Sequence, residues 1–429
     1  MKQWSATGGS YTLSARSRIL VDAETYDTGV TFAADLNVPV EVGGDPQPGD
    51  IRLALGADDT RLGEEGYRLT VGAFVQIEAR TPAGAFYATR TVLQLLDRSG
   101  TVAAGTGCDW PVKPERGLMV DCGRKYFTVG WLRRHIRMLA DLKLNHLHLH
   151  LSDHLGFRLQ SDTHPEVVSA QHYTKKEIAE LVALAARYHI TVVPEIDMPG
   201  HMDPILAAHP GLKLTDAFID LSNPDAYTLI DELIHEYLPL FPGPYWHLGA
   251  DEYIDDYGAY PQLLAYARNR YGPNATAKDA YYGFINWANT RVRAAGKTMR
   301  MWNDGIKPGD GTIDPDSDII VEYWDDIGLT PQQLIDRGHQ IMNCSWTPTY
   351  YVLSPNGARP DVEYLSGSWN PELYQGSAHD STASTIDDPS RNTGAKLHVW
   401  CDDRSAETED QIADGIRAPL RALAQQTWG

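Results

Sequence analysis

Two adjacent carboxylates, Asp251 and Glu252, are the residues of this 429-residue chain that point most directly to chemistry. They end the run YWHLGADE (245–252), whose apolar residues are typical of a buried strand. Because neighbouring carboxylates repel each other, one of them tends to keep its proton at neutral pH. A proton donor beside a group that stays anionic suits cleavage of a glycosidic bond. Most such pairs are solvated surface features, so the surrounding elements decide the interpretation.

From residue 116 onward, short apolar runs alternate with amphipathic helical segments such as 129–143 and 174–189. The runs cover residues 116–122, 145–152, 191–197, 245–252, 298–304, 318–324, 339–345 and 395–403. Eight strands alternating with helices predict an α/β fold, a (β/α)8 barrel over residues 113–429. Nearly every run ends in polar or aromatic residues, and barrel enzymes place their chemistry at that end of each strand. We therefore expect an active site at one mouth of the barrel.

Residues 1–112 show a different pattern, which predicts a small α+β domain ahead of the barrel. One helical pattern covers residues 83–98, and a proline-containing linker covers residues 108–117. The strand-like runs are residues 17–22, 38–42, 50–56, 67–71 and 74–79. Between the last two barrel strands, residues 353–394 are expected to form a long loop region of the kind that shapes pockets.

Three tryptophans, Trp302, Trp324 and Trp400, lie at predicted strand ends. A single tryptophan is more often a packing residue, but three at one barrel mouth would form an aromatic box. The C–H faces of a sugar stack on such rings, and an acetamido methyl group fits between them.

His201 ends the segment PEIDMPGH (194–201), whose Pro-Gly turn would bring it back over the barrel mouth. A lone histidine is usually structural. Together with Asp153 and Glu252, however, it would form an Asp–His–Glu relay that tunes the proton donor.

The histidines of NHLHLHLSDH (145–154) could be metal ligands or packed, hydrogen-bonded strand residues. Strand alternation puts His146, His148 and His150 on one face, with only the last near the mouth, which favours packing. The sequence contains no HExxH helix, serine elbow, dinucleotide fingerprint or P-loop. We therefore expect neither a metal nor a cofactor.

The formal charge of −20 and the pI near 5.1 argue against a nucleic-acid partner. No apolar stretch is long enough to span a bilayer, so no membrane partner is expected. The first residues lack a signal-peptide core, which leaves a cytoplasmic and a secreted location open. A homodimer is also left open. The four cysteines have no metal-binding spacing, and buried free thiols are expected.

Taken together, the motifs make the whole chain resemble glycoside hydrolase family 20, the β-N-acetylhexosaminidases. They are RGLMVDCGRKYF, HLHLSDHLGFRL, VPEIDMPGH, HLGADEY and HVWCDD, with the three tryptophans. The resemblance implies retaining, substrate-assisted hydrolysis of glycans that end in N-acetylhexosamine, in which the 2-acetamido group of the sugar is the nucleophile. Glu252 would then be the acid and base, and Asp251 would hold the acetamido N–H.

The resemblance also implies roles for other residues. Asp153 and His201 would support the acid, and Trp302, Trp324 and Trp400 would line the acetamido pocket. Arg116 would bind sugar hydroxyls, and Tyr351, with Tyr350 as its rival, would contact the acetamido oxygen. Two positions depart from the family pattern. Phe157 replaces a tryptophan, and Asp402 replaces a glutamate that meets the 4- or 6-hydroxyl, which leaves the preference between GlcNAc and GalNAc open.

Three alternatives remain. The chain could release disaccharides, as a lacto-N-biosidase does, or act on substituted sugars or poly-N-acetylglucosamine. It could be a non-catalytic glycan-binding protein, although the intact pair of acids argues against this. It could also be a metal-dependent hydrolase built on the histidine strand.

Overall fold

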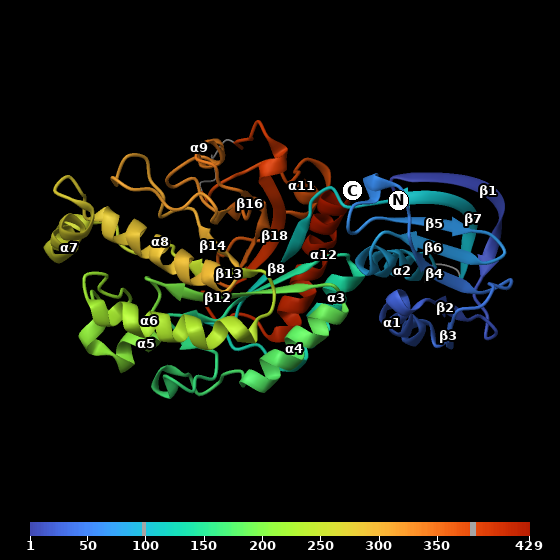
Figure 1. Ribbon diagram of the computed structural model, residues 1–429, viewed down its shortest axis with the longest axis horizontal. Coiled ribbons are helices and arrows are strands. Elements are labelled where there is room, and N and C mark those ends of the chain that lie inside the picture. Colours follow the sequence, from blue (N-terminus) through green and yellow to red (C-terminus); the bar gives the residue numbers. More distant parts are fainter. Residues whose placement is uncertain (97–99, 378–382) are drawn as a thin grey trace.

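The computed structural model describes residues 1–96, 100–377 and 383–429, and it contains a closed parallel barrel beside a smaller sheet domain (Figure 1). The barrel strands are β8 (Glu115–Asp121), β9 (His146–His150), β12 (Thr191–Met198), β13 (Tyr245–Gly249), β14 (Thr298–Trp302), β15 (Ile320–Tyr323), β16 (Ile341–Asn343) and β18 (Asn392–Trp400). All eight predicted runs therefore contain strands. Parallel pairing of β16 with β18 and of β18 with β8 closes the barrel, which confirms the predicted fold.

Three further short strands lie near the barrel mouth. They are β10 (Ser152–Asp153), β11 (Gly156–Phe157) and β17 (Tyr350–Val352). β16 pairs with the first half of β18, whereas β17 pairs with its second half, where Tyr350 lies opposite His398. The edge of β18 nearest the mouth is thus covered by β17, and this brings Tyr350 to the predicted site.

Helices surround the barrel (Figure 1). They are α3 (Val129–Asp141), α4 (Lys175–Arg187), α5 (Asp203–Ala208), α6 (Pro224–Tyr237), α7 (Pro261–Tyr271), α8 (Lys278–Ala294), α9 (Pro331–Asp336), α10 (Trp346–Thr349), α11 (Val362–Gly367) and α12 (Glu409–Trp428). Sequence signals fix several of their starts. Thr174 and Glu177 form a capping box at the start of α4, which satisfies backbone N–H groups that have no partner within the helix.

The N-terminal domain is a seven-stranded mixed sheet with two helices. Its elements are β1 (Gln3–Thr12), β2 (Ile19–Val21), α1 (Tyr26–Leu36), β3 (Val40–Val42), β4 (Ile51–Leu55), β5 (Tyr67–Val71), β6 (Val75–Ala79), α2 (Pro82–Leu96) and β7 (Thr101–Asp109). The five predicted strands are present, but β1, β7 and α1 were not predicted. The last two residues of the predicted 83–98 helix lie outside the described residues.

The predicted long loop, residues 353–394, contains α11. Its last three residues, 392–394, are the first residues of the long strand β18. Residues 378–382 of this segment lie outside the described residues. The prediction therefore missed a short helix within this segment. Asp361 caps the helix, because its side chain accepts hydrogen bonds from the backbone N–H groups of Glu363 and Tyr364.

Buried charges occupy the inside of the barrel. Glu322 pairs with Arg300 at 2.6 Å and also with Lys396. Glu195 is within 3.0 Å of His148 and 2.6 Å of His150. These histidines are thus packed and hydrogen-bonded, as their strand alternation suggested. Each of these two carboxylates has basic side chains beside it, which offset the cost of removing its charge from water.

The two domains meet at the start of β8 and beside α12, where the chain ends also lie close together (Figure 1). Asp109, at the end of β7, is almost completely buried and accepts hydrogen bonds from Tyr67 and from Trp428 on α12. The Lys143 ammonium lies 3.4 Å from the same carboxylate. The four cysteines are free and buried. Among the described residues, no helix combines the length and apolar character needed to cross a bilayer.

Candidate active site

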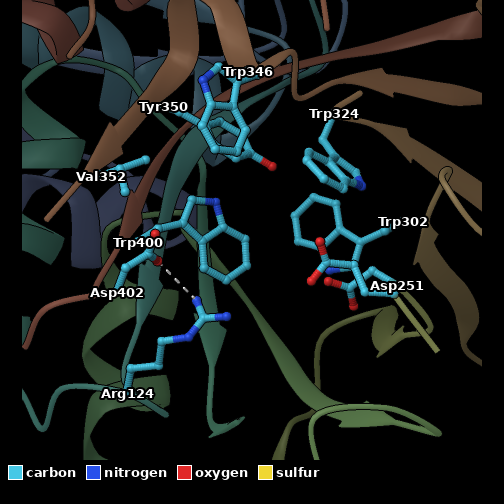
Figure 2. A pocket seen from close by; sticks show the side chains of 10 residues that line it. Arg124, Asp251, Trp302, Trp324, Trp346, Tyr350, Val352, Trp400 and Asp402 are labelled. Atoms are coloured by element: carbon cyan, nitrogen blue, oxygen red, sulfur yellow. Dashed lines mark ion pairs between the residues drawn. The ribbon is translucent and has the colours of Figure 1, made fainter. Parts of the chain in front are cut away.

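A pocket with a cavity volume of about 170 Å³ opens at the C-terminal ends of the barrel strands (Figure 2). Its lining comes from β14, α10, β17 and β18 and from the turns that follow β8, β13, β15 and β18. The lining residues are Arg124, Asp251, Glu252, Trp302, Trp324, Trp346, Tyr350, Val352, Trp400 and Asp402. The pocket lies where parallel barrels place their active sites, and five of its lining residues are aromatic.

A strained turn after β13 presents the two carboxylates. Gly249, Ala250 and Glu252 have φ angles of +79°, +70° and +47°. A Cβ atom on Gly249 would lie 1.9 Å from an oxygen of Asp197, so only glycine fits there. The Glu252 N–H donates to Asp304 at 2.9 Å, which anchors the turn to the end of β14. Left-handed conformations at non-glycine residues cost free energy and cluster at functional sites.

His201 lies between the acids and Asp153, as the predicted relay requires. Its Nδ1 is 3.3 Å from Asp153 Oδ1, and its Nε2 is 3.4 Å from Glu252 Oε2 and 3.7 Å from Asp251 Oδ2. Burial opposes a charge on the imidazole, but Asp197 and Asp251 nevertheless hold the pKa of His201 well above its usual range. The ring is therefore protonated in the free pocket and can donate to both sides.

The two adjacent acids have opposite pKa shifts. Burial raises the pKa of Asp251 to about 7, with Asp304 and Glu252 adding to the shift and His201 opposing it. The hydrogen bond from His201 lowers the pKa of Glu252, whose side chain is 58% exposed. In the free pocket at neutral pH, Glu252 is thus the anion, and Asp251 is close to half protonated. The two pKa values are thus moved apart, mainly by burial of Asp251, and the charge of the adjacent Glu252 adds to this effect.

Asp251 has an oxygen available for a ligand. Its Oδ1 is buried and has no hydrogen-bond partner among the residues that the structure describes. Buried polar atoms are nearly always paired, so an unpaired oxygen beside a cavity indicates where a ligand group would bind. A ligand N–H placed there would complete the site.

Aromatic rings form the walls of the pocket (Figure 2). Trp302 and Trp400 have ring centroids 5.9 Å apart, and Trp324 stacks on Tyr350 with its centroid 6.2 Å away. Trp346, which sequence analysis missed, lies beside Tyr350 at 4.8 Å. The structure thus brings the three predicted tryptophans together.

Two carboxylates outside the cavity fix the orientation of two of these rings. Trp302 Nε1 donates to Glu195 at 2.8 Å, and Trp324 Nε1 donates to Asp304 at 3.0 Å. Because Asp304 also anchors the backbone of Glu252, one carboxylate positions both a wall of the pocket and the turn that bears the acids.

Two models of protein families match the sequence of this chain. The model of the glycosyl hydrolase family 20 catalytic domain matches residues 114–429, and the model of domain 2 of the same family matches residues 1–110. The chain belongs to glycoside hydrolase family 20. Both parts of the chain, the barrel and the small domain, are therefore parts of one family architecture.

Several proteins of known activity are similar to this family 20 chain. The lacto-N-biosidase of Bifidobacterium bifidum is 32% identical over 100% of this chain, which spans 39% of that protein's length. The β-N-acetylhexosaminidase of Cellulomonas fimi is 28% identical over 98% of this chain and 87% of that protein. A mutant Streptomyces plicatus β-hexosaminidase, solved in complex with product (GlcNAc), is 26% identical, with a TM-score of 0.80 over 99% of this chain and 89% of that one.

The expectation that Arg116 binds the sugar is not met in this family 20 structure. Arg116 is the second residue of β8, at the end of the barrel away from the pocket, and its side chain is completely buried against the N-terminal domain. Its Nη1 lies 2.7 Å from Glu65. Arg124, three residues past the end of β8, lines the pocket instead, with Asp402 3.6 Å away (Figure 2). The rule that chemistry lies at the C-terminal ends of strands would have selected Arg124.

The choice between the neighbouring tyrosines is also reversed. Because successive strand residues point to opposite faces, only one of them can face the cavity. Tyr350 lines the pocket and points its hydroxyl into it, as Figure 2 shows. Tyr351 points away and donates to Glu407 at 2.7 Å. Asp402 does line the pocket, whereas Phe157 is buried and is not among the lining residues.

Proposed function

We propose that this chain is a retaining β-N-acetylhexosaminidase that removes terminal β-linked N-acetylhexosamine by substrate-assisted catalysis. The observation that carries the proposal is the pair Asp251–Glu252 beside a box of aromatic rings, with one unpaired carboxylate oxygen facing the cavity. Membership of family 20 supports the reaction class. The similar β-hexosaminidase that binds GlcNAc supports the sugar.

In the first step, the acetamido carbonyl oxygen of the substrate attacks the anomeric carbon, and the glycosidic C–O bond breaks. Glu252 gives its proton to the departing oxygen. The acetamido N–H donates to Asp251, whose negative charge stabilises the positive charge of the cyclic intermediate. The aromatic walls hold the acetamido methyl group and keep water away from the ring.

In the second step, water attacks the anomeric carbon from the face that the leaving group vacated. Glu252 takes a proton from that water, the bond from the anomeric carbon to the acetamido oxygen breaks, and the acetamido group is restored. Two displacements leave the configuration unchanged. Arg124 and Asp402, on the opposite wall, are placed to bind hydroxyls of the same sugar.

Substrate binding must reverse the proton preference of the pair, because the pKa of Asp251 is raised and that of Glu252 is lowered in the free pocket. An acetamido N–H on Asp251 favours the anionic form of that group. A sugar that covers the exposed Glu252 removes water from it and favours its neutral form. Both changes act in the same direction, so the substrate itself prepares the acid.

Hydrolysis of 4-nitrophenyl β-N-acetylglucosaminide and β-N-acetylgalactosaminide, with the parent and Asp251→Ala side by side, tests this proposal. We expect turnover of at least one substrate by the parent, and at least a hundredfold loss in the variant, because the acetamido group is no longer held. A parent inactive on both sugars but active on a 4-nitrophenyl lacto-N-bioside would instead establish a disaccharide-releasing enzyme.

A further inference from the structure

Four side chains of metal-ligand type converge on the outside of the barrel, away from the pocket. They are His164, Glu166, His209 and Glu232. His164 and Glu166 flank the start of the 3₁₀ turn Pro165–Val167, His209 directly follows α5, and Glu232 lies on α6. α5 and α6 lie together at the lower left of the barrel in Figure 1, far from the N-terminal domain.

The spacing of three atoms in this cluster matches that of metal ligands. Glu166 Oε1 is 3.2 Å from His164 Nδ1 and 2.9 Å from His209 Nε2. A tetrahedral zinc ion with bonds of about 2.0–2.1 Å holds its ligand atoms about 3.3 Å apart. Both distances from Glu166 are therefore close to the separation that one ion would impose, and all three atoms lie within 4.8 Å of one another.

The hydrogen bonding of the two histidines also fits an ion. His209 Nε2 is buried and makes no hydrogen bond to any described residue, although Glu166 Oε1 is close. His164 presents Nδ1 to the cluster, while its Nε2 lies 2.9 Å from Glu232 Oε2. A carboxylate on the far nitrogen of a histidine ligand is the usual outer support of a zinc site, because it fixes the ring and its tautomer.

We propose that His164 Nδ1, Glu166 and His209 Nε2 bind one zinc-class divalent cation, with Glu232 orienting His164. The ion's remaining position faces a hollow with a cavity volume of about 400 Å³ that Asp225 and Glu232 also line, so water or a small ligand completes the coordination. Two imidazoles and a carboxylate suit zinc or copper rather than calcium or magnesium, which prefer oxygen ligands alone.

Two other clusters of ligand-type residues do not carry this inference. His148, Glu195 and His247 are completely buried inside the barrel, where the Lys396 ammonium lies 2.8 Å from His148 and supplies a positive charge already. Asp153, with His154 and His201, belongs to the pocket described above.

An ion at this site would tie three segments of the barrel wall together. α5 begins at Asp203, two residues after the relay histidine His201, and ends at Ala208, directly before His209. A bound cation would fix the far end of α5 to α6 and to the turn at Pro165–Val167. The expected effect is greater resistance to unfolding without a change in the chemistry of the pocket.

Calorimetric titration of zinc chloride into chelator-treated protein tests the proposal. We expect one equivalent to bind, the melting temperature to rise with zinc, and calcium to have no effect. His209→Gln should weaken zinc binding at least a hundredfold because a ligand is lost, and Glu232→Gln should weaken it about 10- to 100-fold. His235→Gln is the matched control, since this exposed histidine bonds to its own helix on α6, and its affinity should equal that of the parent.

Activity measured in the same titration separates this site from the pocket. Glycosidase turnover of the parent and of His209→Gln should be unchanged by one equivalent of zinc, which also shows that the variant folds. Zinc that inhibits turnover and still binds His209→Gln would place the ion at His154 and His201 and overturn the proposal. Absence of zinc binding to the folded parent would overturn it as well, whatever the result for glycoside hydrolysis.

Discussion

Glu252 combines two properties that a proton donor at a pocket mouth needs. Its carboxylate lies 3.4 Å from His201 Nε2, and more than half of its side chain is exposed. His201 is in turn held by Asp153, which His150 also contacts at 2.8 Å. The relay thus runs from the inside of the barrel to its surface.

Replacing the acid by an amide of the same shape should separate binding from turnover. We expect Glu252→Gln to lower kcat about 10²- to 10⁴-fold on substrates with alkoxide-like leaving groups, because no proton is donated. KM should change little, since the amide fills the same space. The measurement is steady-state kinetics on aryl glycosides of graded leaving-group pKa. A loss that is equal across the series would contradict the acid assignment.

The pH dependence of kcat/KM should reflect the shared proton of the pair. The active form carries one proton on the two carboxylates, because Asp251 must be anionic while Glu252 is protonated. Above pH about 7 the pair loses this one remaining proton, because the pKa of Asp251 is about 7. We therefore expect kcat/KM to fall through that range. Activity should also fall at acid pH, where Glu252 gains a proton while Asp251 keeps its own.

A profile measured between pH 4 and pH 9 with a 4-nitrophenyl glycoside checks this expectation. The control is thermal unfolding over the same range, which separates titration of the site from loss of fold. A kcat/KM value that stays constant to pH 9 would show that the pair is not the group that titrates.

Individual residues show where sequence reasoning reached its limit. The positions of Asp251, Glu252 and the three tryptophans follow from strand ends, which apolar runs mark well. Arg116 and Arg124 lie within one motif, and only the point where β8 begins and ends decides which of them faces the pocket. Tyr350 and Tyr351 differ only in the face of a three-residue strand, and the strand's register depends on its partner β18.

At the scale of elements, the turn after β13 is the most constrained connection in the site. Gly249 has φ +79°, and the Asp197 side chain occupies the space that any Cβ atom would need. The strained residues that follow it stay in place because Asp304 and Tyr281 hold their backbone groups. A change at Gly249 would therefore move both catalytic carboxylates.

We expect Gly249→Ala to destabilise the protein by about 2 kcal/mol or more, because a strained φ and a steric clash act together. Turnover should drop at least tenfold even in the fraction that stays folded, since small misplacements of catalytic groups are costly. Urea unfolding and kinetics measure the two effects. Gly367→Ala on α11, where a Cβ atom meets nothing within 4 Å, is the control and should be nearly neutral. A fully active and stable Gly249→Ala would contradict this account of the turn.

Two strands that sequence analysis missed, β1 and β7, share a physical reason. β1 (QWSATGGSYT) is exposed along nearly its whole length and contains two adjacent glycines, so it has no apolar alternation to detect. β7 contains glycines and alanines, and its pairing with β5 and β1 stabilises it rather than its own composition. The barrel strands were found because both faces of such strands are buried, which gives continuous apolar runs.

At the scale of the whole molecule, Arg116 joins the two domains. It lies within 2.7 Å of Glu65 and donates to the Lys143 carbonyl at 3.0 Å and to the Lys113 carbonyl at 2.8 Å. Its guanidinium also lies 5.2 Å from the Trp428 ring. One side chain thus contacts the small domain, the linker, the barrel and α12.

We expect Arg116→Met to lower the free energy of unfolding by about 3 kcal/mol, because Glu65 and several carbonyl groups lose their partner in a buried place. KM should stay unchanged, since the residue lies at the end of β8 away from the pocket. Arg124→Lys is the comparison, and it should raise KM with little loss of stability because a fork of donors is replaced by a single ammonium. If Arg116→Met raised KM without loss of stability, and Arg124→Lys lowered stability without a change in KM, Arg116 rather than Arg124 would be the sugar-binding residue.

The concentration of indole rings around the cavity gives the protein a built-in optical reporter. Four of its eleven tryptophans, Trp302, Trp324, Trp346 and Trp400, line one pocket. A sugar that enters this pocket lies against the surrounding indole rings and changes their emission. Intrinsic fluorescence can therefore rank unlabelled glycans by affinity, including those that the enzyme binds without cleaving.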